Sequence, residues 1–151
     1  MGGWLMDKIF TKPRVAAISA CVSKNRLELS DLADLYGEET VAKIMKVTGI
    51  RMVSVAPKGT TTADYCTAAA KYLMQEQNID PQTIDGLVFV TETPDYIIPH
   101  TSAILQERLG LPNRALAFDI NYGCAGYVYG IFQASLLIES GYCRRVLLCA
   151  G

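Results

Sequence analysis

The sequence has no excess of charge of either sign and contains a single histidine. Its 151 residues include 14 Lys and Arg and 15 Asp and Glu, so the formal net charge is −1 at pH 7. This balance gives no basic field for nucleic acid or for an anionic membrane. His100 is the only histidine and no C-x-x-C pair occurs, so the usual zinc-site spacings are absent. We therefore expect no metal site and no nucleic-acid partner.

Long hydrophobic runs are also missing. The longest apolar stretch, residues 125–138, is interrupted by Gln133 and is too short to span a bilayer. The N-terminal ten residues contain too short an apolar run for a secretory signal. An odd number of cysteines without such a signal indicates reduced thiols, so we expect a cytoplasmic protein without a membrane span. The five are Cys21, Cys66, Cys124, Cys143 and Cys149.

Short apolar runs alternate with helical patterns along the chain. Buried strands are expected over residues 14–21, 87–91, 115–120 and 145–150. Helices are expected over a short stretch from Ser30 and over residues 38–48, 62–78, 100–109 and 125–140. This alternation predicts an α/β fold, and the continuously apolar strands predict that helices cover both faces of the sheet.

The last expected helix, residues 125–140, carries apolar side chains on nearly every face. This pattern predicts a helix that is buried all round. Gly126, Gly130 and Ala134 form a stripe of small residues along one side, where another backbone can approach closely. The stripe either packs on the chain's own sheet or faces a second helix that this chain does not contain.

The sequence ends at Gly151, directly after an apolar strand. Complete domains rarely leave such a strand as a fresh edge. We therefore expect either a chain that has been cut at this point or a chain that needs a partner.

One cysteine stands between an expected strand and an expected helix. The segment Asn121-Tyr122-Gly123-Cys124-Ala125-Gly126 places a thiol on a tight turn between small residues. The partial positive charge of a helix N-terminus favours the thiolate form, and glycines leave room for a substrate carbonyl. Cys124 is thus a candidate nucleophile. The alternative is a small buried core residue, which free cysteine often is.

Several segments, taken in order, resemble one known family. They are TGIR at residues 48–51, DGLV at 85–88, the expected helix after Pro99, AFDINYGCAGYVYG at 117–130 and SGYCRRVLLCAG at 140–151. Together they resemble the first half of condensing enzymes of the ketoacyl-carrier-protein synthase III type, members of the thiolase superfamily. The D-I-N-x-x-C-A-G segment is the specific part, and it identifies Cys124 with the family's nucleophile.

The resemblance implies a layered thiolase-like fold with a mixed, mostly parallel sheet. It implies an acyltransferase of fatty-acid synthesis in which the cysteine takes an acyl group from a coenzyme A or phosphopantetheine thioester. A malonyl group on a carrier protein then loses CO2 and attacks, which gives a 3-oxoacyl product. The assisting histidine and asparagine lie in the second half, so residues 1–151 alone are expected to be inactive in condensation. No permanently bound cofactor is implied.

The resemblance also implies partners. Family members are homodimers that pair the strand before the nucleophile, here residues 115–120, and they act on acyl carrier protein and acyl-coenzyme A. The loop before Pro99 then reaches the partner's acyl pocket, where Ile98 limits the room for the acyl chain. The alternative for Ile98 is an ordinary apolar residue before proline.

Three alternatives remain open at this stage. Lys43 and Val47 replace the tryptophan and arginine that hold adenine in the bacterial type, so the acyl donor can be larger or differently held, in a specialised pathway. Lys43 and Lys46 either attract the phosphates of the acyl donor or are ordinary solvated lysines on a helix. The same cysteine could also pass its acyl group to an alcohol or amine, or be inert in a non-catalytic partner subunit.

Overall fold

A computed structural model describes residues 10–151 of the chain. These residues form two compact units. Unit 1 contains the described part of the segment up to Ala20 together with Thr62–Gly151, and unit 2 is Cys21–Thr61. The two units are described separately below.

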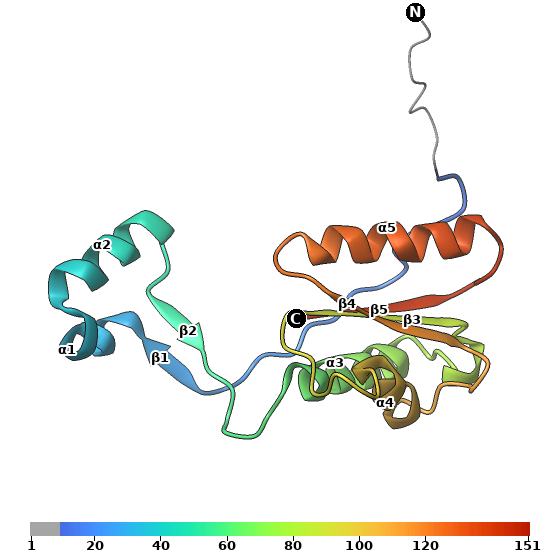
Figure 1. Cartoon of the computed structure of the whole chain (residues 1–151), viewed down its shortest axis with the longest axis horizontal. Coiled ribbons are helices and arrows are strands. Elements are labelled where there is room, and N and C mark those ends of the chain that lie inside the picture. Colours follow the sequence, from blue (N-terminus) through green and yellow to red (C-terminus); the bar gives the residue numbers. More distant parts are fainter. Residues whose placement is uncertain (1–9) are drawn as a thin grey trace, which may run out of the picture. The chain divides into compact units, whose positions relative to one another are not determined.

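A three-stranded parallel sheet forms the centre of unit 1 (Figure 1). Strand β3 (Gly86–Thr91) lies between β4 (Leu116–Asn121) and β5 (Val146–Ala150). All six residues of β3 are buried, because this strand has a neighbour on each side and a helical layer on each face. The predicted α/β class and the three strands of this sheet are confirmed.

Helices cover both faces of this sheet (Figure 1). Helices α3 (Thr62–Glu76) and α4 (Thr101–Arg108) lie on one face, and α5 (Gly126–Glu139) lies on the other. A short 3-10 helix, η2 (Pro81–Thr83), precedes β3. The core between β3, α3 and α4 is built from apolar side chains such as Phe89, Leu105 and Ala63.

The small-residue stripe of α5 packs on the chain's own sheet. A Cβ at Gly130 would lie 2.8 Å from Val90 Cγ2 and 2.8 Å from Leu148 Cδ1. A Cβ at Gly126 would lie 2.7 Å from Val90 Cγ1. For these two positions the first of the two alternatives is therefore correct, since their missing side chains let α5 approach β3 and β5.

The prediction that α5 is buried all round is wrong for the described chain. Its outer face is open, and Val128 is 67% exposed and Phe132 42% exposed. The helix does carry apolar residues on nearly every face, but the described part of unit 1 has a single sheet for it to cover. The outer face of α5 is a large exposed apolar surface of the kind that marks an interaction site.

Residues 10–12, the first described residues of unit 1, pack against α5. The backbone N–H groups of Thr11 and Lys12 each donate to the Glu139 carboxylate at 2.9 Å, and the Thr11 hydroxyl donates to it at 2.8 Å. The bonds from Lys12 and Thr11 lower the pKa of Glu139. Phe10 packs edge-on against Phe132, with 5.7 Å between the ring centroids.

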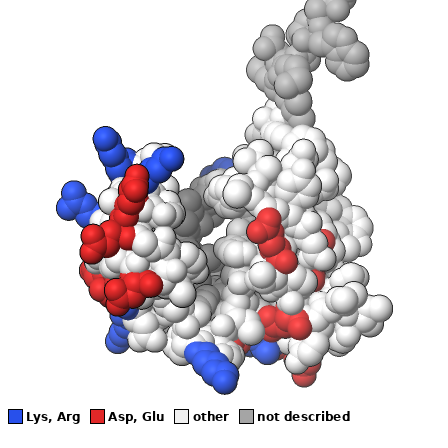
Figure 2. Space-filling view, turned by 60° about the vertical axis from the view of Figure 1, so that its left-hand side comes forward, with Lys and Arg blue, Asp and Glu red and all other residues white. Residues whose placement is uncertain are grey.

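Unit 2 is a small hairpin with helices at its tip. Strands β1 (Arg26–Glu28) and β2 (Met52–Ser54) pair antiparallel. Between them come the 3-10 helix η1 (Leu29–Leu32), α1 (Ala33–Tyr36) and α2 (Glu38–Thr48). Helix α2 has the predicted range, and Gly49 ends it because this residue takes the left-handed conformation, φ 72°. Figure 2 shows acidic and basic side chains close together on the surface of this unit.

Two local predictions are wrong. Residues 14–21 form no strand, because no described strand pairs with them, and Cys21 is exposed. Ser30 does not begin a helix, since it lies within the 3-10 helix η1. The buried residues of α3 are Ala63, Cys66, Ala70 and Met74, and Leu73 packs against the same core.

Candidate active site

Cys124 lies in the turn that joins β4 to α5. Strand β4 ends at Asn121, which pairs with Thr91 at the carboxyl end of β3, and α5 begins at Gly126. The Gly126 N–H donates to the Gly123 carbonyl at 2.6 Å, which closes the turn around Cys124. The expected strand–turn–helix setting of this thiol is therefore present.

Cys124 is exposed. Cys66, Cys143 and Cys149 are buried, so the alternative of a core residue does not describe Cys124. Since Gly126 has no side chain, the first turn of α5 lies directly on β3, where Val90 fills the available space. An exposed sulfur at the start of an α-helix, at the carboxyl end of a parallel sheet, is open to a substrate from solvent.

Glu92 lies against the same turn and was not singled out from the sequence. It is the residue directly after β3, and a Cβ at Gly123 would collide with its Oε1 and lie 3.1 Å from its Cδ. The carboxylate therefore occupies the space that any side chain at position 123 would need. The sequence does not distinguish Glu92 from an ordinary surface residue, because a glutamate that follows a strand is commonly solvated.

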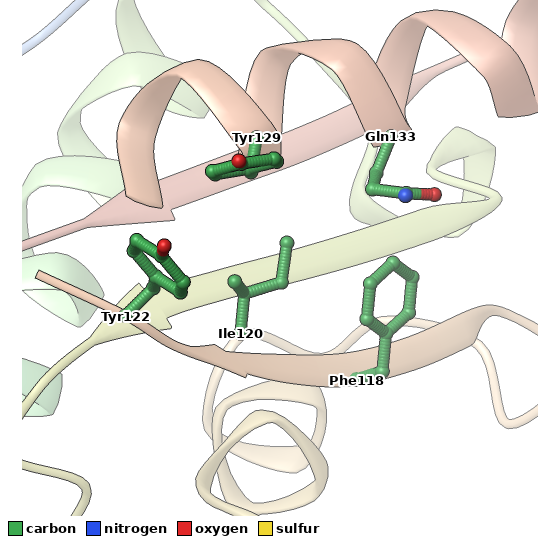
Figure 3. A pocket seen from close by; sticks show the side chains of 5 residues that line it. All are labelled: Phe118, Ile120, Tyr122, Tyr129 and Gln133. Carbon is green, nitrogen blue, oxygen red and sulfur yellow. The ribbon is translucent and has the colours of Figure 1, made fainter. Parts of the chain in front are cut away.

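An open groove of about 410 Å³ lies along β4 and α5. Figure 3 shows its lining: Phe118 and Ile120 rise from β4, Tyr122 follows that strand, and Tyr129 and Gln133 descend from α5. The rings of Tyr122 and Tyr129 are 5.1 Å apart. Because Tyr122 precedes Cys124 by two residues, one end of the groove lies at the turn that carries the thiol.

The other predicted site residues are not among those that line this groove. Ile98 is 85% exposed in the loop between β3 and α4 and does not line it. His100 is exposed at the N-terminus of α4. Lys43, Lys46 and Val47 are exposed on α2 of unit 2, which is the setting of solvated helix residues.

The buried cysteines are held in the core. A hydrogen bond from Cys149 lowers the pKa of the Cys66 thiol. The same hydrogen bond, together with burial, raises the pKa of Cys149. Burial and the nearby Asp85 raise the pKa of Cys143. None of the three lies in the turn after β4, and neither does the exposed Cys21, so Cys124 is the candidate nucleophile.

The described residues contain neither a metal-binding cluster nor a membrane-spanning helix. No group of three or more His, Cys, Asp or Glu side chains there is placed to hold a metal ion. No described helix is long and apolar enough to cross a membrane.

Comparison with known proteins shows what the chain is similar to. The family profile of 3-Oxoacyl-[acyl-carrier-protein (ACP)] synthase III matches residues 118–151, which include β4, the Cys124 turn, α5 and β5. A putative 3-oxoacyl-[acyl-carrier-protein] synthase 3 of Campylobacter jejuni is 33% identical over 147 residues, covering 95% of this chain and 42% of that protein. The predicted resemblance to the type III synthases is confirmed.

Solved structures of such synthases have the same fold. The 3-oxoacyl-(acyl-carrier protein) synthase of Burkholderia xenovorans matches with a TM-score of 0.82 and 32% identity, over 87% of this chain and 38% of that one. A 2.1 Å crystal structure of a 3-oxoacyl-(acyl-carrier-protein) synthase III matches with a TM-score of 0.82 and 38% identity, over 90% of this chain and 41% of that one. The fold is therefore thiolase-like, and the chain spans about 40% of the length of these synthases.

Proposed function

We propose that the protein is an acyltransferase of the condensing type that works through an acyl group on Cys124. The observation that carries the proposal is the exposed thiol on the glycine-flanked turn between β4 and α5, in a chain similar to 3-oxoacyl-carrier-protein synthases. The acyl donor is a thioester of coenzyme A or of a carrier protein's phosphopantetheine. We place this reaction in the cytoplasm.

In the first step the Cys124 thiolate attacks the thioester carbonyl. The turn that carries Cys124 leads into the N-terminus of α5, whose partial positive charge stabilises negative charge that develops during the attack. We propose that the Cys124 N–H donates to the oxygen that becomes negative in the tetrahedral intermediate. When this intermediate collapses, the donor thiol leaves and the acyl group remains on Cys124.

In the second step we propose that a malonyl group on acyl carrier protein loses CO2 and attacks the acyl-cysteine, which gives a 3-oxoacyl product. The names of the similar proteins support this acceptor. The only histidine, His100, is exposed at the start of α4 and is not placed at the Cys124 turn. We therefore propose that the assisting histidine and asparagine belong to the part of the protein that the similar synthases have in addition.

We further propose that the protein is a homodimer that pairs β4 across a two-fold axis. Strand β4 is at the edge of the described sheet, and the apolar groove formed by Phe118, Ile120, Tyr122 and Tyr129 runs beside it. Edge strands with apolar surroundings are usually covered in native proteins. In that dimer the exposed Ile98 reaches the acyl pocket of the partner and limits its length.

A second candidate reaction is acyl transfer from Cys124 to an alcohol or amine. Its support is the Glu92 carboxylate beside Gly123, because such acceptors must lose a proton as they attack. A non-catalytic role is the third possibility. An exposed Cys124 that reacts with iodoacetamide no faster than a simple model thiol would support that role.

The test is the denatured intact mass of the naturally produced protein, before and after incubation with a panel of acyl thioesters. We expect a mass increase of one acyl group, lost in Cys124→Ala and retained in Cys21→Ala, which removes the other exposed cysteine. The acyl length that reacts fastest identifies the donor. A folded protein that gains no acyl group from any donor would contradict the proposed function.

A further inference from the structure

We propose that Glu92 gives the site a second acyl-transfer activity, toward acceptors whose attacking atom carries a proton. In this reaction the carboxylate accepts that proton. The inference rests on the proposed acyl-Cys124 intermediate, and it assigns Glu92 the role of proton acceptor in the second candidate reaction.

The position of Glu92 follows from the strand order. Strands β3 and β4 are parallel and in register, with Thr91 opposite Asn121, so the residues that follow them emerge at the same edge of the sheet. Glu92 follows β3 directly, and the Cys124 turn follows β4. The end of β3 thus places the Glu92 carboxylate beside the turn that contains Cys124.

Glycine at position 123 makes this approach possible. A Cβ there would collide with Glu92 Oε1 and lie 3.1 Å from Cδ and 3.8 Å from Cγ. The carboxylate end of Glu92 therefore lies against the backbone of the residue next to Cys124. A side chain of any size at position 123 would push it away from the turn.

The carboxylate is available for chemistry. Glu92 is exposed, and within residues 10–151 its side chain has no hydrogen-bond or ion-pair partner. Carboxylates with a structural role usually cap a helix or bind a cation, as Asp119 does at the start of α4. Glu92 does neither, although it lies at the turn that carries the exposed thiol.

The reaction is balanced without any further reagent. As the acceptor oxygen or nitrogen attacks the acyl carbonyl, its proton passes to the Glu92 carboxylate and a new C–O or C–N bond forms. The C–S bond then breaks, and its electron pair returns to Cys124 Sγ as thiolate. Glu92 finally releases the proton to water, so the site returns to its starting state.

Condensation with a malonyl group does not require this proton acceptor. The attacking carbon there acquires its electron pair by loss of CO2 and not by loss of a proton. The malonyl carboxylate is also an anion, and like charges at close range repel each other. Glu92 therefore favours neutral, proton-bearing acceptors over malonyl groups.

The experiment measures two products formed from the same acyl-enzyme. The naturally produced protein is loaded with the acyl thioester that reacts fastest and is then given malonyl-carrier protein, 1-butanol or butylamine in separate reactions. We expect an ester or amide product, and we expect Glu92→Gln to lower the ratio of this product to the 3-oxoacyl product about 100-fold or more. Glu107→Gln, an exposed glutamate on α4, is the control and should leave the ratio as it is.

Gly123→Ala provides a second variant. It keeps the glutamate but fills the space of its carboxylate, so the same ratio should fall. Damage to the fold lowers both products together, and an unchanged ratio in either variant would overturn the proposal. A wild-type acyl-enzyme that yields neither ester nor amide would also overturn it. Absence of any acyl group on Cys124 would instead refute the underlying function.

Discussion

Single residues at the turn after β4 have different tasks. Cys124 is exposed and offers its sulfur to solvent, while Gly126 and Gly130 allow α5 to lie on β3 and β5. Gly123 makes room for a carboxylate from another strand. These small residues therefore have separate roles. Cys124 is open to a substrate, Gly126 and Gly130 allow close helix packing, and Gly123 leaves space for a carboxylate.

Gly130→Ala should destabilise the protein. Alanine favours the helical state over glycine by about 1 kcal/mol, but the new methyl group would lie 2.8 Å from both Val90 Cγ2 and Leu148 Cδ1. Overpacking of this kind costs about 1–3 kcal/mol, so we expect a net loss and a lower thermal midpoint. In Gly123→Ala only the exposed end of Glu92 must move, so its midpoint should fall less. A midpoint for Gly130→Ala at or above that of the wild type would contradict the packing described for α5.

At the scale of elements, the D-I-N-x-x-C-A-G segment does more than present the nucleophile. Asp119 in β4 accepts hydrogen bonds from the backbone N–H groups of Thr101 at 2.9 Å and Ser102 at 2.8 Å. A strand carboxylate thus satisfies two unpaired donors at the start of α4 and ties this helix to the sheet. The motif residue that sequence comparison associates with the active site has a structural role in this contact.

Asp119→Asn should loosen this attachment. The amide keeps one acceptor oxygen but replaces the other with an NH2 group that faces a backbone donor. We expect a loss of about 1–2 kcal/mol, measured by thermal or denaturant unfolding. Glu76→Gln, which removes an exposed carboxylate at the end of α3, is the matched control and should change stability by less than about 0.5 kcal/mol. Equal stability of Asp119→Asn and the control would show that the two hydrogen bonds contribute little.

At the scale of the whole molecule, two apolar surfaces of unit 1 are left open. One is the outer face of α5, with Tyr127, Val128 and Phe132, and the other is the groove beside β4. The similar synthases are more than twice as long as this chain, which covers 42% of the Campylobacter jejuni protein. We propose that the additional part of the protein covers α5 and that a second copy covers β4.

Ile120→Lys tests the second of these surfaces. Ile120 is half-buried in the groove beside β4, so a lysine can reach solvent in the monomer but would place an unpaired charge in the proposed dimer contact. We expect the wild type to sediment as a dimer and the variant as a folded monomer. Ala68→Lys, on the exposed side of α3, should remain dimeric. A monomeric wild type, or a dimeric Ile120→Lys, would refute pairing through β4.

The sequence by itself determined the α/β class, the three sheet strands, the four main helices and the setting of Cys124. These features depend on local periodicity, on helix-ending glycines such as Gly49, and on a motif of consecutive residues, all of which are present in the chain order. The resemblance to type III synthases followed from the same local information.

Only the tertiary structure decided the rest. Residues 14–21 have a strand pattern but no strand partner, and α5 has apolar residues all round but one sheet to cover. The approach of Glu92 to Gly123 joins residues 31 positions apart, and it arises because β3 and β4 are parallel and in register. Pairing, burial and such contacts depend on which segments become neighbours in space, and local patterns do not contain that information.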